Sequence, residues 1–406
     1  MKKGGILMTK VLERIEEMRT NMVEALMGFV SINSVNPAFG GPGEKEKADW
    51  LEGLLRDLGY PEVERVDVVD ERGVVRSNIL AKIAGKHTER TLWVVTHIDT
   101  VPEGDITLWR HDPFTPFVED GKVFGRGAED NGGSMVASIF AGKALMDLGL
   151  SPWFNYGLAL VADEEAGSKY GISYLIKEGY FSKDDLFLVP DAGNSKGDFV
   201  EIAEKSILWF KVEILGRQGH ASKPSKTINA FRAGIKAISL LDETLHKKFN
   251  SRNDLFDEPF STFEPTKCEK TVDNVNTIPG RFVFYFDCRL IPEHDPDEVL
   301  RTVEEVLSSG YDYRLEVLNK QKAPAPTSRD SYVVRKLEEI LRSQRNLEVK
   351  VGGIGGGTCA AFFRREGWEA VVWSTIDETA HQPNEYKRID HMVEDAKVFA
   401  QLALGG

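Results

Sequence analysis

Short apolar runs alternate with amphipathic segments along most of this chain. Four of the runs are rich in β-branched and aliphatic residues, which is typical of buried strands: 79–83, 92–96, 156–162 and 186–189. Apolar residues also recur at helical spacing over 11–30, and further helices are expected over 44–58 and 133–148. Strands that alternate with helices indicate an α/β domain with a mostly parallel central sheet.

The pattern changes near residue 206 and returns near residue 320. Between these points we predict strand, helix, strand, helix and strand at 207–215, 228–248, 282–290, 297–308 and 313–318. Beyond them we expect a helix, a strand and a last helix at 332–342, 371–374 and 391–404. With 406 residues, the chain is also longer than one core usually supports. We therefore predict a discontinuous first domain, residues 1–205 and 320–406, interrupted by a small α+β insert, residues 206–319.

Composition narrows the classes of function. The net charge is −13 and no basic run is present, which argues against nucleic acid as a partner. No segment approaches the ~20 consecutive apolar residues of a membrane span, and the first residues do not resemble a signal peptide. The three cysteines, Cys268, Cys288 and Cys359, form no Cys-x-x-Cys pair, which favours a reduced, cytoplasmic setting.

Ligand-type side chains follow four of the predicted strands. They are His97, the pair Glu164 and Glu165, Asp191, and His381. Because ligands in open α/β sheets gather at the carboxyl ends of the strands, we expect these side chains to converge at one rim. Imidazole and carboxylate are ligands that zinc takes in proteins, and this set is large enough for two divalent ions. One residue of the glutamate pair would bind metal, and its neighbour would handle protons.

Two more acidic residues accompany this set. Asp130 lies in a glycine-rich turn that opens a helix, so it is either a helix N-cap or a carboxylate that bridges two ions about 3.5–4 Å apart. Asp99 lies two residues after His97 and is either a solvated turn residue or the group that orients the imidazole.

The insert carries candidate substrate-binding residues. His220 is either an ordinary loop histidine or a donor to a developing oxyanion. Asn276 and Arg289 bracket a predicted strand, and an arginine can hold a carboxylate in a bidentate pair. The glycine-rich stretch 352–358 lacks the lysine of a phosphate-binding loop, so we expect its backbone to approach a substrate instead.

These motifs resemble the di-zinc metallopeptidase family of carboxypeptidase G, acetylornithine deacetylase, succinyl-diaminopimelate desuccinylase, aminoacylase and the carnosinase-like dipeptidases. The resemblance covers nearly the whole chain. It is carried by Val95-Thr96-His97-Ile98-Asp99-Thr100-Val101-Pro102, Asp112-Pro113-Phe114, Gly125-Arg126-Gly127-Ala128-x-Asp130, Glu164-Glu165, Gly219-His220-Ala221, Asn276-Thr277-Ile278-Pro279-Gly280, Asp287-Cys288-Arg289 and His381-Gln382-Pro383-Asn384-Glu385.

The resemblance implies a zinc-peptidase-like catalytic domain with a lid inserted in it. His97 and Asp191 would bind one metal, Glu165 and His381 the other, and Asp130 both. Glu164 would be the general base and then the acid, and Asp99 would orient His97. Zinc is favoured, and cobalt or manganese suits the same ligands. A cis peptide after Asp130 is also implied.

The family further implies a homodimer formed through the lid. His220 and Asn276 would then reach the active site of the partner subunit. Arg289 and the backbone of Gly355, Gly356 and Gly357 would hold a substrate carboxylate.

Two positions bear on the substrate and on local packing. The chain has Asp130-Asn131-Gly132-Gly133 where the family usually shows Asp-x-Lys-Gly, and the missing lysine is not a metal ligand. The ligand at position 191 is aspartate, which leans toward the family's peptidases.

We predict an enzyme that hydrolyses an amide bond next to a free carboxylate, with a metal-bound hydroxide as nucleophile. The leading prediction is a metallopeptidase of carboxypeptidase or dipeptidase type. The alternative is an N-acyl-amino-acid deacylase, such as a desuccinylase or a deacetylase. A non-catalytic metal-binding or amino-acid-binding protein is disfavoured by the full ligand set and by Glu164.

Overall fold

The computed structural model describes residues 2–405, and the side chains from residue 6 onward. The chain divides into two compact units. The first comprises Met1–Ile202, Thr327–Val351 and Thr358–Gly406, and the second comprises Ala203–Pro326 and Gly352–Gly357. The insert was predicted at 206–319, and the glycine-rich residues 352–357 were not assigned to it.

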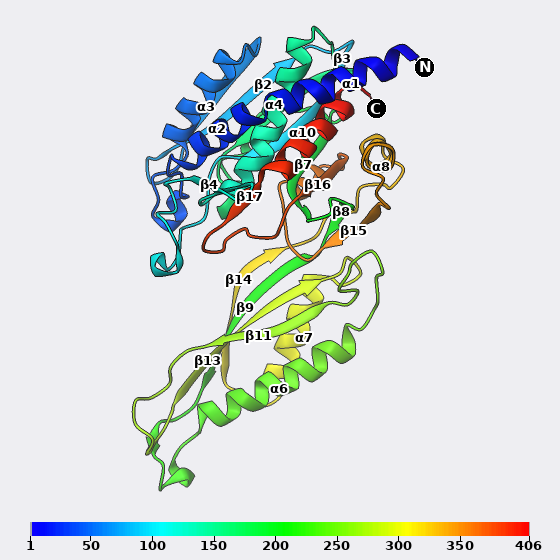
Figure 1. Cartoon of the computed structure of the whole chain (residues 1–406). Helices are drawn as coiled ribbons and strands as arrows, with labels where there is room; N and C mark the ends of the chain where they lie inside the picture. The colour runs from blue at the N-terminus through cyan, green and yellow to red at the C-terminus, as the bar shows by residue number, and fades with distance from the viewer. Residues whose placement is uncertain (1, 406) are drawn as a thin grey trace. The chain divides into compact units, whose positions relative to one another are not determined.

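The first unit contains most of an eight-stranded mixed sheet with the order β1-β2-β6-β3-β7-β16-β8-β15 (Figure 1). Its strands are β1 (Glu62–Val69), β2 (Val75–Ile83), β3 (His87–His97), β6 (Phe154–Val161), β7 (Leu186–Asn194), β8 (Phe199–Glu204), β15 (Lys350–Ile354) and β16 (Ala370–Thr375). The predicted parallel arrangement holds for the central strands β6, β3, β7 and β16. Strands β1, β2 and β8 pair antiparallel, so the sheet as a whole is mixed.

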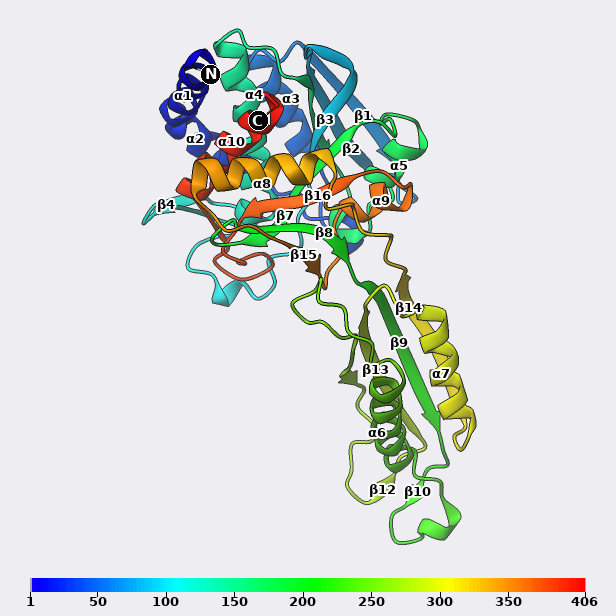
Figure 2. The same cartoon turned by 90° about the vertical axis from the view of Figure 1, so that its right-hand side faces the viewer.

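Burial explains why these central strands are nearly continuous apolar runs. The last seven residues of β3 and the last six of β6 are buried, because helices cover both faces of the sheet. One face carries α4 and α10, which lie side by side, with α1, α2, α3 and α8, while α5 and α9 pack on the other (Figures 1 and 2). These helices are α1 (Lys2–Glu17), α2 (Arg19–Val30), α3 (Lys45–Asp57), α4 (Ser134–Asp147), α5 (Ile172–Lys177), α8 (Tyr332–Arg345), α9 (Ala360–Arg365) and α10 (Ile389–Ala403).

The segment predicted as one helix over 11–30 forms parts of two helices. The backbone of Met18 leaves the helical region with φ −87° and ψ 5°, so the segment predicted over 11–30 is divided into α1 and α2. A three-stranded sheet, in the order β17-β5-β4, also lies in this unit: β4 (Phe117–Glu119), β5 (Lys122–Phe124) and β17 (Tyr386–Arg388).

The second unit is a four-stranded antiparallel sheet, in the order β11-β13-β9-β14, with α6 and α7 packed on one face (Figure 2). Its elements are β9 (Ser206–Leu215), α6 (Ala230–Lys248), β11 (Thr262–Cys268), β13 (Arg281–Leu290), α7 (Pro296–Ser308) and β14 (Tyr313–Gln321). Alternate residues of β9 are buried against the helices, as its sequence pattern predicts. A small pair of strands, β10 (Gly219–His220) and β12 (Thr277–Ile278), lies at one end of this sheet.

Within residues 2–405, every helix is too short or too polar to span a lipid bilayer.

Candidate metal centre

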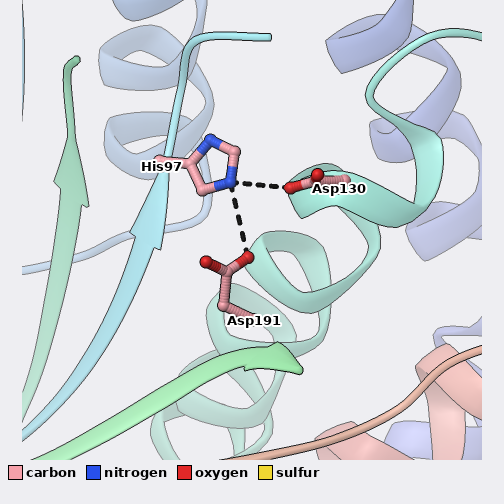
Figure 3. A group of neighbouring side chains, drawn as sticks. All are labelled: His97, Asp130 and Asp191. Atoms are coloured by element: carbon pink, nitrogen blue, oxygen red, sulfur yellow. Dashed lines mark hydrogen bonds and ion pairs between the residues drawn. The ribbon is translucent and has the colours of Figure 1, made fainter. Parts of the chain in front are cut away.

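The first candidate ligand group gathers around His97. This histidine is the last residue of β3 and is almost fully buried. Its Nε2 atom lies 2.8 Å from Asp130 Oδ1 and 3.4 Å from Asp191 Oδ1 (Figure 3). Asp191 lies on β7, next to β3 in the parallel sheet, and Asp130 lies in the turn before α4. These three side chains are close enough to share one metal ion.

The second group gathers around His381, in the loop between β16 and β17. The His381 Nε2 atom lies 3.1 Å from Asp130 Oδ2 and 3.2 Å from Glu165 Oε2. Glu165 follows the carboxyl end of β6, and together with Asp130 and His381 it forms a second set of three possible ligands.

Asp130 belongs to both groups and turns a different carboxylate oxygen to each histidine. Its backbone is extended rather than helical, with φ −112° and ψ 91°. The peptide bond from Asp130 to Asn131 is cis, as the resemblance implied. Asp130 therefore has the arrangement of a carboxylate that bridges two ions.

The Asp99 carboxylate holds the backbone of the glutamate pair. It accepts hydrogen bonds from the backbone N–H groups of Glu164, at 3.0 Å, and Glu165, at 3.2 Å. His97 Nδ1 lies 2.9 Å from the backbone oxygen of Asp99 but 3.7 Å from its carboxylate Oδ1. The backbone of Asp99 therefore contacts the imidazole, while its side chain fixes the segment that carries Glu164 and Glu165. The orienting role predicted for the Asp99 carboxylate stays a prediction.

Crowding and burial shift the pKa values of Glu164, Glu165, His381 and His97. Burial raises the pKa of Glu164 well above its usual range, and the neighbouring Asp191 carboxylate adds to the rise. Burial and Asp130 raise the pKa of Glu165 to about 7. Hydrogen bonds with Asp130 and Glu165 raise the pKa of His381 to about 10. Burial lowers the pKa of His97, but Asp191 and Asp130 outweigh it and hold that pKa well above the ordinary value.

The donor set fits divalent metal ions. Two imidazoles and three carboxylates supply the nitrogen and oxygen ligands that zinc takes, and they fall into two groups that share one bridging residue. Glu165 Oε1 is buried without a hydrogen-bond partner in the described chain, although a buried carboxylate oxygen normally has one. Protons on the imidazoles offset the crowded negative charge in the protein itself, and a bound cation would take over that role.

The remaining predicted site residues lie in the second unit. His220 on β10 pairs with Thr277 on β12, and the backbone oxygen of Asn276 accepts a hydrogen bond from Ala221 N at 2.9 Å. Arg289 lies near the other end of β13, roughly 25 Å away along a strand of this length. Its guanidinium makes a bidentate pair with Asp287, at 2.7 and 3.1 Å, and donates to the backbone oxygen of Gly355 at 3.0 Å. Within this unit, His220 and Asn276 are therefore close together and Arg289 is remote from both.

Gly355, Gly356 and Gly357 have free space around their α-carbons. A Cβ atom added at Gly355 or Gly356 would meet no heavy atom within 4 Å, and at Gly357 it would meet only Ile207 Cδ1, at 3.8 Å.

The sequence analysis missed several polar residues that support the ligands. Asn36 Nδ2 donates to Asp99 Oδ2 at 2.7 Å, and Asn131 Nδ2 donates to Asp191 Oδ1 at 2.8 Å. Glu129 and Glu385 accept hydrogen bonds from the backbone of the segments around His381 and Asp130. Glu385 was part of a quoted motif, and Glu129 and Asn131 flank a predicted ligand, but these positions alone do not indicate which groups the side chains contact.

Comparison with known proteins identifies the family. The profile of peptidase family M20/M25/M40 matches residues 93–405, which is more than half of the chain. An uncharacterized metallohydrolase of Methanococcus maripaludis is 40% identical over 408 residues, covering 94% of this chain and 98% of the relative. The succinyl-diaminopimelate desuccinylase of Rickettsia bellii is 24% identical over 385 residues, covering 92% and 93%.

Solved structures share the fold. Human carnosine dipeptidase 1 matches with a TM-score of 0.74 and 20% identity, covering 98% of both chains. An M20 family metallo-carboxypeptidase from Sulfolobus solfataricus matches with a TM-score of 0.74 and 21% identity, covering 94% of this chain and 98% of that one.

Proposed function

This chain belongs to peptidase family M20/M25/M40, and from that premise we propose that it hydrolyses an amide bond next to a free carboxylate. The observation that carries the proposal is the pair of ligand groups that share Asp130, with Glu164 close enough to feel the charges of Asp191, His97, Glu165 and Asp130. The leading substrate class is a short peptide, cleaved in the manner of a carboxypeptidase or a dipeptidase. Two solved structures with the same fold are described as enzymes of these kinds, and the aspartate at position 191 leans the same way.

Two divalent ions, zinc in the first place and cobalt or manganese as substitutes, are the proposed cofactors. His97 and Asp191 would hold one ion, Glu165 and His381 the other, and Asp130 both. When bound, such ions supply Lewis acidity and lower the pKa of a coordinated water to about 7.

Glu164 is the proposed proton carrier. Its backbone is fixed by Asp99, and burial favours the protonated form of its carboxyl group. A carboxylate held in this way can accept a proton from the attacking water and return it to the departing nitrogen. The raised pKa makes the Glu164 carboxylate a stronger proton acceptor than an exposed glutamate, which favours the first of these two transfers.

Substrate recognition is assigned to the second unit. Arg289 and the backbone of Gly355, Gly356 and Gly357 are proposed to hold the substrate carboxylate, and the Arg289 to Gly355 hydrogen bond supports their acting together. His220 is proposed to stabilise the oxyanion, with Asn276 beside it. Because His220 and Asn276 lie at the far end of β13 from Arg289, we assign them to the active site of a partner subunit.

A homodimer through the second unit is part of this proposal. Phe231 and Ile235, in the first turns of α6, are 45% and 50% exposed, and Ile228, just before the helix, is 54% exposed. Apolar side chains grouped on one helix surface are typical of a protein interface.

A deacylase that removes an acyl group from an N-acyl amino acid is the second candidate. The observation that favours it is the match to a desuccinylase over 92% of this chain. The same ligands and the same Glu164 would serve either reaction, because both cleave an amide beside a carboxylate.

A panel of dipeptides and of N-acetyl and N-succinyl amino acids distinguishes the peptidase from the deacylase. Metal-stripped protein is assayed with each substrate before and after zinc, cobalt or manganese is added. Metal-dependent cleavage of peptides alone supports the peptidase, and cleavage of acyl amino acids alone supports the deacylase. Absence of turnover on the whole panel with metal bound would contradict the proposed function.

Glu164→Gln tests the proton carrier. We expect kcat to fall by about 10²–10⁴ because the amide cannot carry a proton, while both metal ions still bind. Metal content is measured beside the kinetics. A variant with full activity would contradict the role of Glu164.

A cytoplasmic location is also proposed. It rests on the three cysteines, which are all free thiols.

A further inference from the structure

Two buried glutamates outside the ligand set connect the segments that carry Asp130 and His381. Glu129 directly precedes Asp130, and Glu385 lies four residues after His381. Both are at most 3% exposed. The motif that carries the family resemblance leaves position 129 open, so nothing in that motif assigns a task to Glu129.

Glu385 reaches from the His381 segment into the turn that leads to Asp130. Its Oε2 atom accepts hydrogen bonds from Arg126 Nη1 at 2.7 Å and from Gly127 N at 3.1 Å. Its Oε1 atom accepts from Glu129 N at 2.9 Å and from Asp130 N at 3.0 Å. The backbone of the bridging residue is therefore held by a carboxylate from the His381 segment.

Glu129 reaches in the opposite direction. Its Oε1 atom accepts a hydrogen bond from Asp377 N at 2.7 Å, and its Oε2 atom accepts from Thr379 N and, at 2.8 Å, from Thr379 Oγ1. These donors lie two to four residues before His381. The loop that places His381 is thus fixed by the residue beside Asp130.

These reciprocal hydrogen bonds of Glu129 and Glu385 make the positions of Asp130 and His381 depend on each other. Buried backbone N–H groups that lose their acceptor are costly, so the loop must shift or let in water if the Glu129 carboxylate is removed. The first ligand group is built differently, because His97 and Asp191 lie on adjacent strands of the main sheet. Loss of Glu129 should therefore disturb the group of Asp130, Glu165 and His381 more than that of His97, Asp130 and Asp191.

We propose that Glu129 is a positioning residue that sets the His381 loop against Asp130 and so determines the affinity of the second metal site. This inference rests on the proposed two-metal function. It assigns to Glu129 a contact through the protein backbone and not a contact with substrate or metal.

The test is a stepwise cobalt titration of metal-stripped protein, followed by calorimetry and by the visible absorption of bound cobalt. For Glu129→Ala we expect the second equivalent to bind about 10–100-fold more weakly and the first to change by no more than about threefold. Glu129→Gln keeps one acceptor oxygen, so its affinity for the second equivalent of cobalt should lie between those of Glu129→Ala and the wild type. If Glu129→Ala does not fold, the titration of Glu129→Gln alone tests the proposal: the second equivalent of cobalt should bind more weakly and the first should not.

Glu201→Gln is the matched control. Glu201 is also a buried carboxylate in the first unit. Its Oε1 atom lies 2.8 Å from Arg364 Nη1, and neither residue belongs to the proposed ligand groups. This variant should lose stability without changing either cobalt affinity. Equal weakening of both equivalents by the Glu129 variants, or wild-type binding of both, would overturn the inference. Wild-type protein that binds fewer than two equivalents would instead overturn the proposed function, so the two failures are distinguishable.

Discussion

Single residues at the candidate metal centre divide into the proposed ligands and the residues that hold the backbone around those ligands in place. Asp130, His97 and His381 form the centre through atoms 2.8 and 3.1 Å apart. Next to these residues along the chain or in the fold, the carboxylate oxygens of Asp99, Glu129 and Glu385 accept hydrogen bonds from backbone N–H groups. Such bonds fix the course of the backbone at each ligand, and the ligand geometry follows from it.

Lys47 is a buried lysine whose Nζ atom has no hydrogen-bond partner among the described residues. Its Nζ atom lies 3.7 Å from the centre of the Phe29 ring, and the charged groups around it are Asp99, Glu385 and Glu44. Burial, opposed by these carboxylates, lowers the pKa of Lys47 from 10.5 to about 7. Between those two pH values the unfolded chain binds the proton more tightly, so this residue destabilises the fold less as the pH rises.

Lys47→Met removes this dependence. Relative to wild type, the metal-stripped variant should be more stable at pH 6 than at pH 9, by roughly 2–3 kcal/mol in the difference of unfolding free energies. Urea denaturation at the two pH values measures it. Lys45→Met, at an exposed position of the same helix, serves as the control and should show no such change. An equal effect of Lys47→Met at both pH values would contradict a lowered pKa.

At the scale of elements, helix α2 packs its Phe29 ring against the turn at Asp130. A Cβ atom at Gly132 would lie 2.6 Å from Phe29 Cδ1 and 2.6 Å from the backbone oxygen of Gly127. This contact explains why the chain has glycine where the family usually shows lysine, since any side chain at position 132 needs that space.

Gly132→Ala should therefore destabilise the protein by about 1–3 kcal/mol through overpacking. Phe29→Leu in the same chain should recover only part of the loss, because the Gly127 oxygen still obstructs the new methyl group. Thermal unfolding of the single and double variants measures this coupling. Gly53→Ala within α3, where a Cβ meets nothing within 4 Å, should be neutral or stabilising. If Gly132→Ala is as well tolerated as Gly53→Ala, the packing explanation is wrong.

The elements that the sequence predicts well are those whose burial is uniform. Strands β3, β6, β7 and β16 each contain a buried, mostly apolar run, and the ends of these runs locate His97, Glu164, Glu165 and Asp191. Edge strands were missed because their patterns are weak: β1 is largely exposed and charged, and β15 contains two glycines.

Supporting residues were missed for a different reason. The hydrogen bonds of Glu129 and Glu385 join residues about 250 positions apart, and most of them come from backbone N–H groups. No local pattern of side chains signals such a bond, since any sequence supplies the donor. The reciprocal hydrogen bonds between the Glu129 and Glu385 segments are seen only in the folded chain.

At the scale of the whole molecule, the proposed site residues are distributed over two units. The first unit holds every proposed metal ligand, and the second holds His220, Asn276, Arg289 and the glycine-rich segment. The separation of His220 from Arg289 along β13 is the reason to assign these residues to different active sites of a homodimer.

Subunit mixing tests that assignment. Glu164→Gln and His220→Ala should each be nearly inactive alone. When the two are unfolded together and refolded, half of the dimers should be mixed, and one site in each should have both Glu164 and the partner subunit's His220 intact. Activity should then recover to about a quarter of the wild-type value. No recovery, with mixed dimers shown by mass spectrometry, would place His220 in its own subunit's site or outside any site.

The central claim is that two metal ions share Asp130. Anomalous diffraction from crystals grown with zinc tests it most directly. The account predicts two peaks about 3.5–4 Å apart, one beside His97 and Asp191 and one beside Glu165 and His381, with Asp130 between them. A single peak, or two peaks of which only one lies against Asp130, would contradict it.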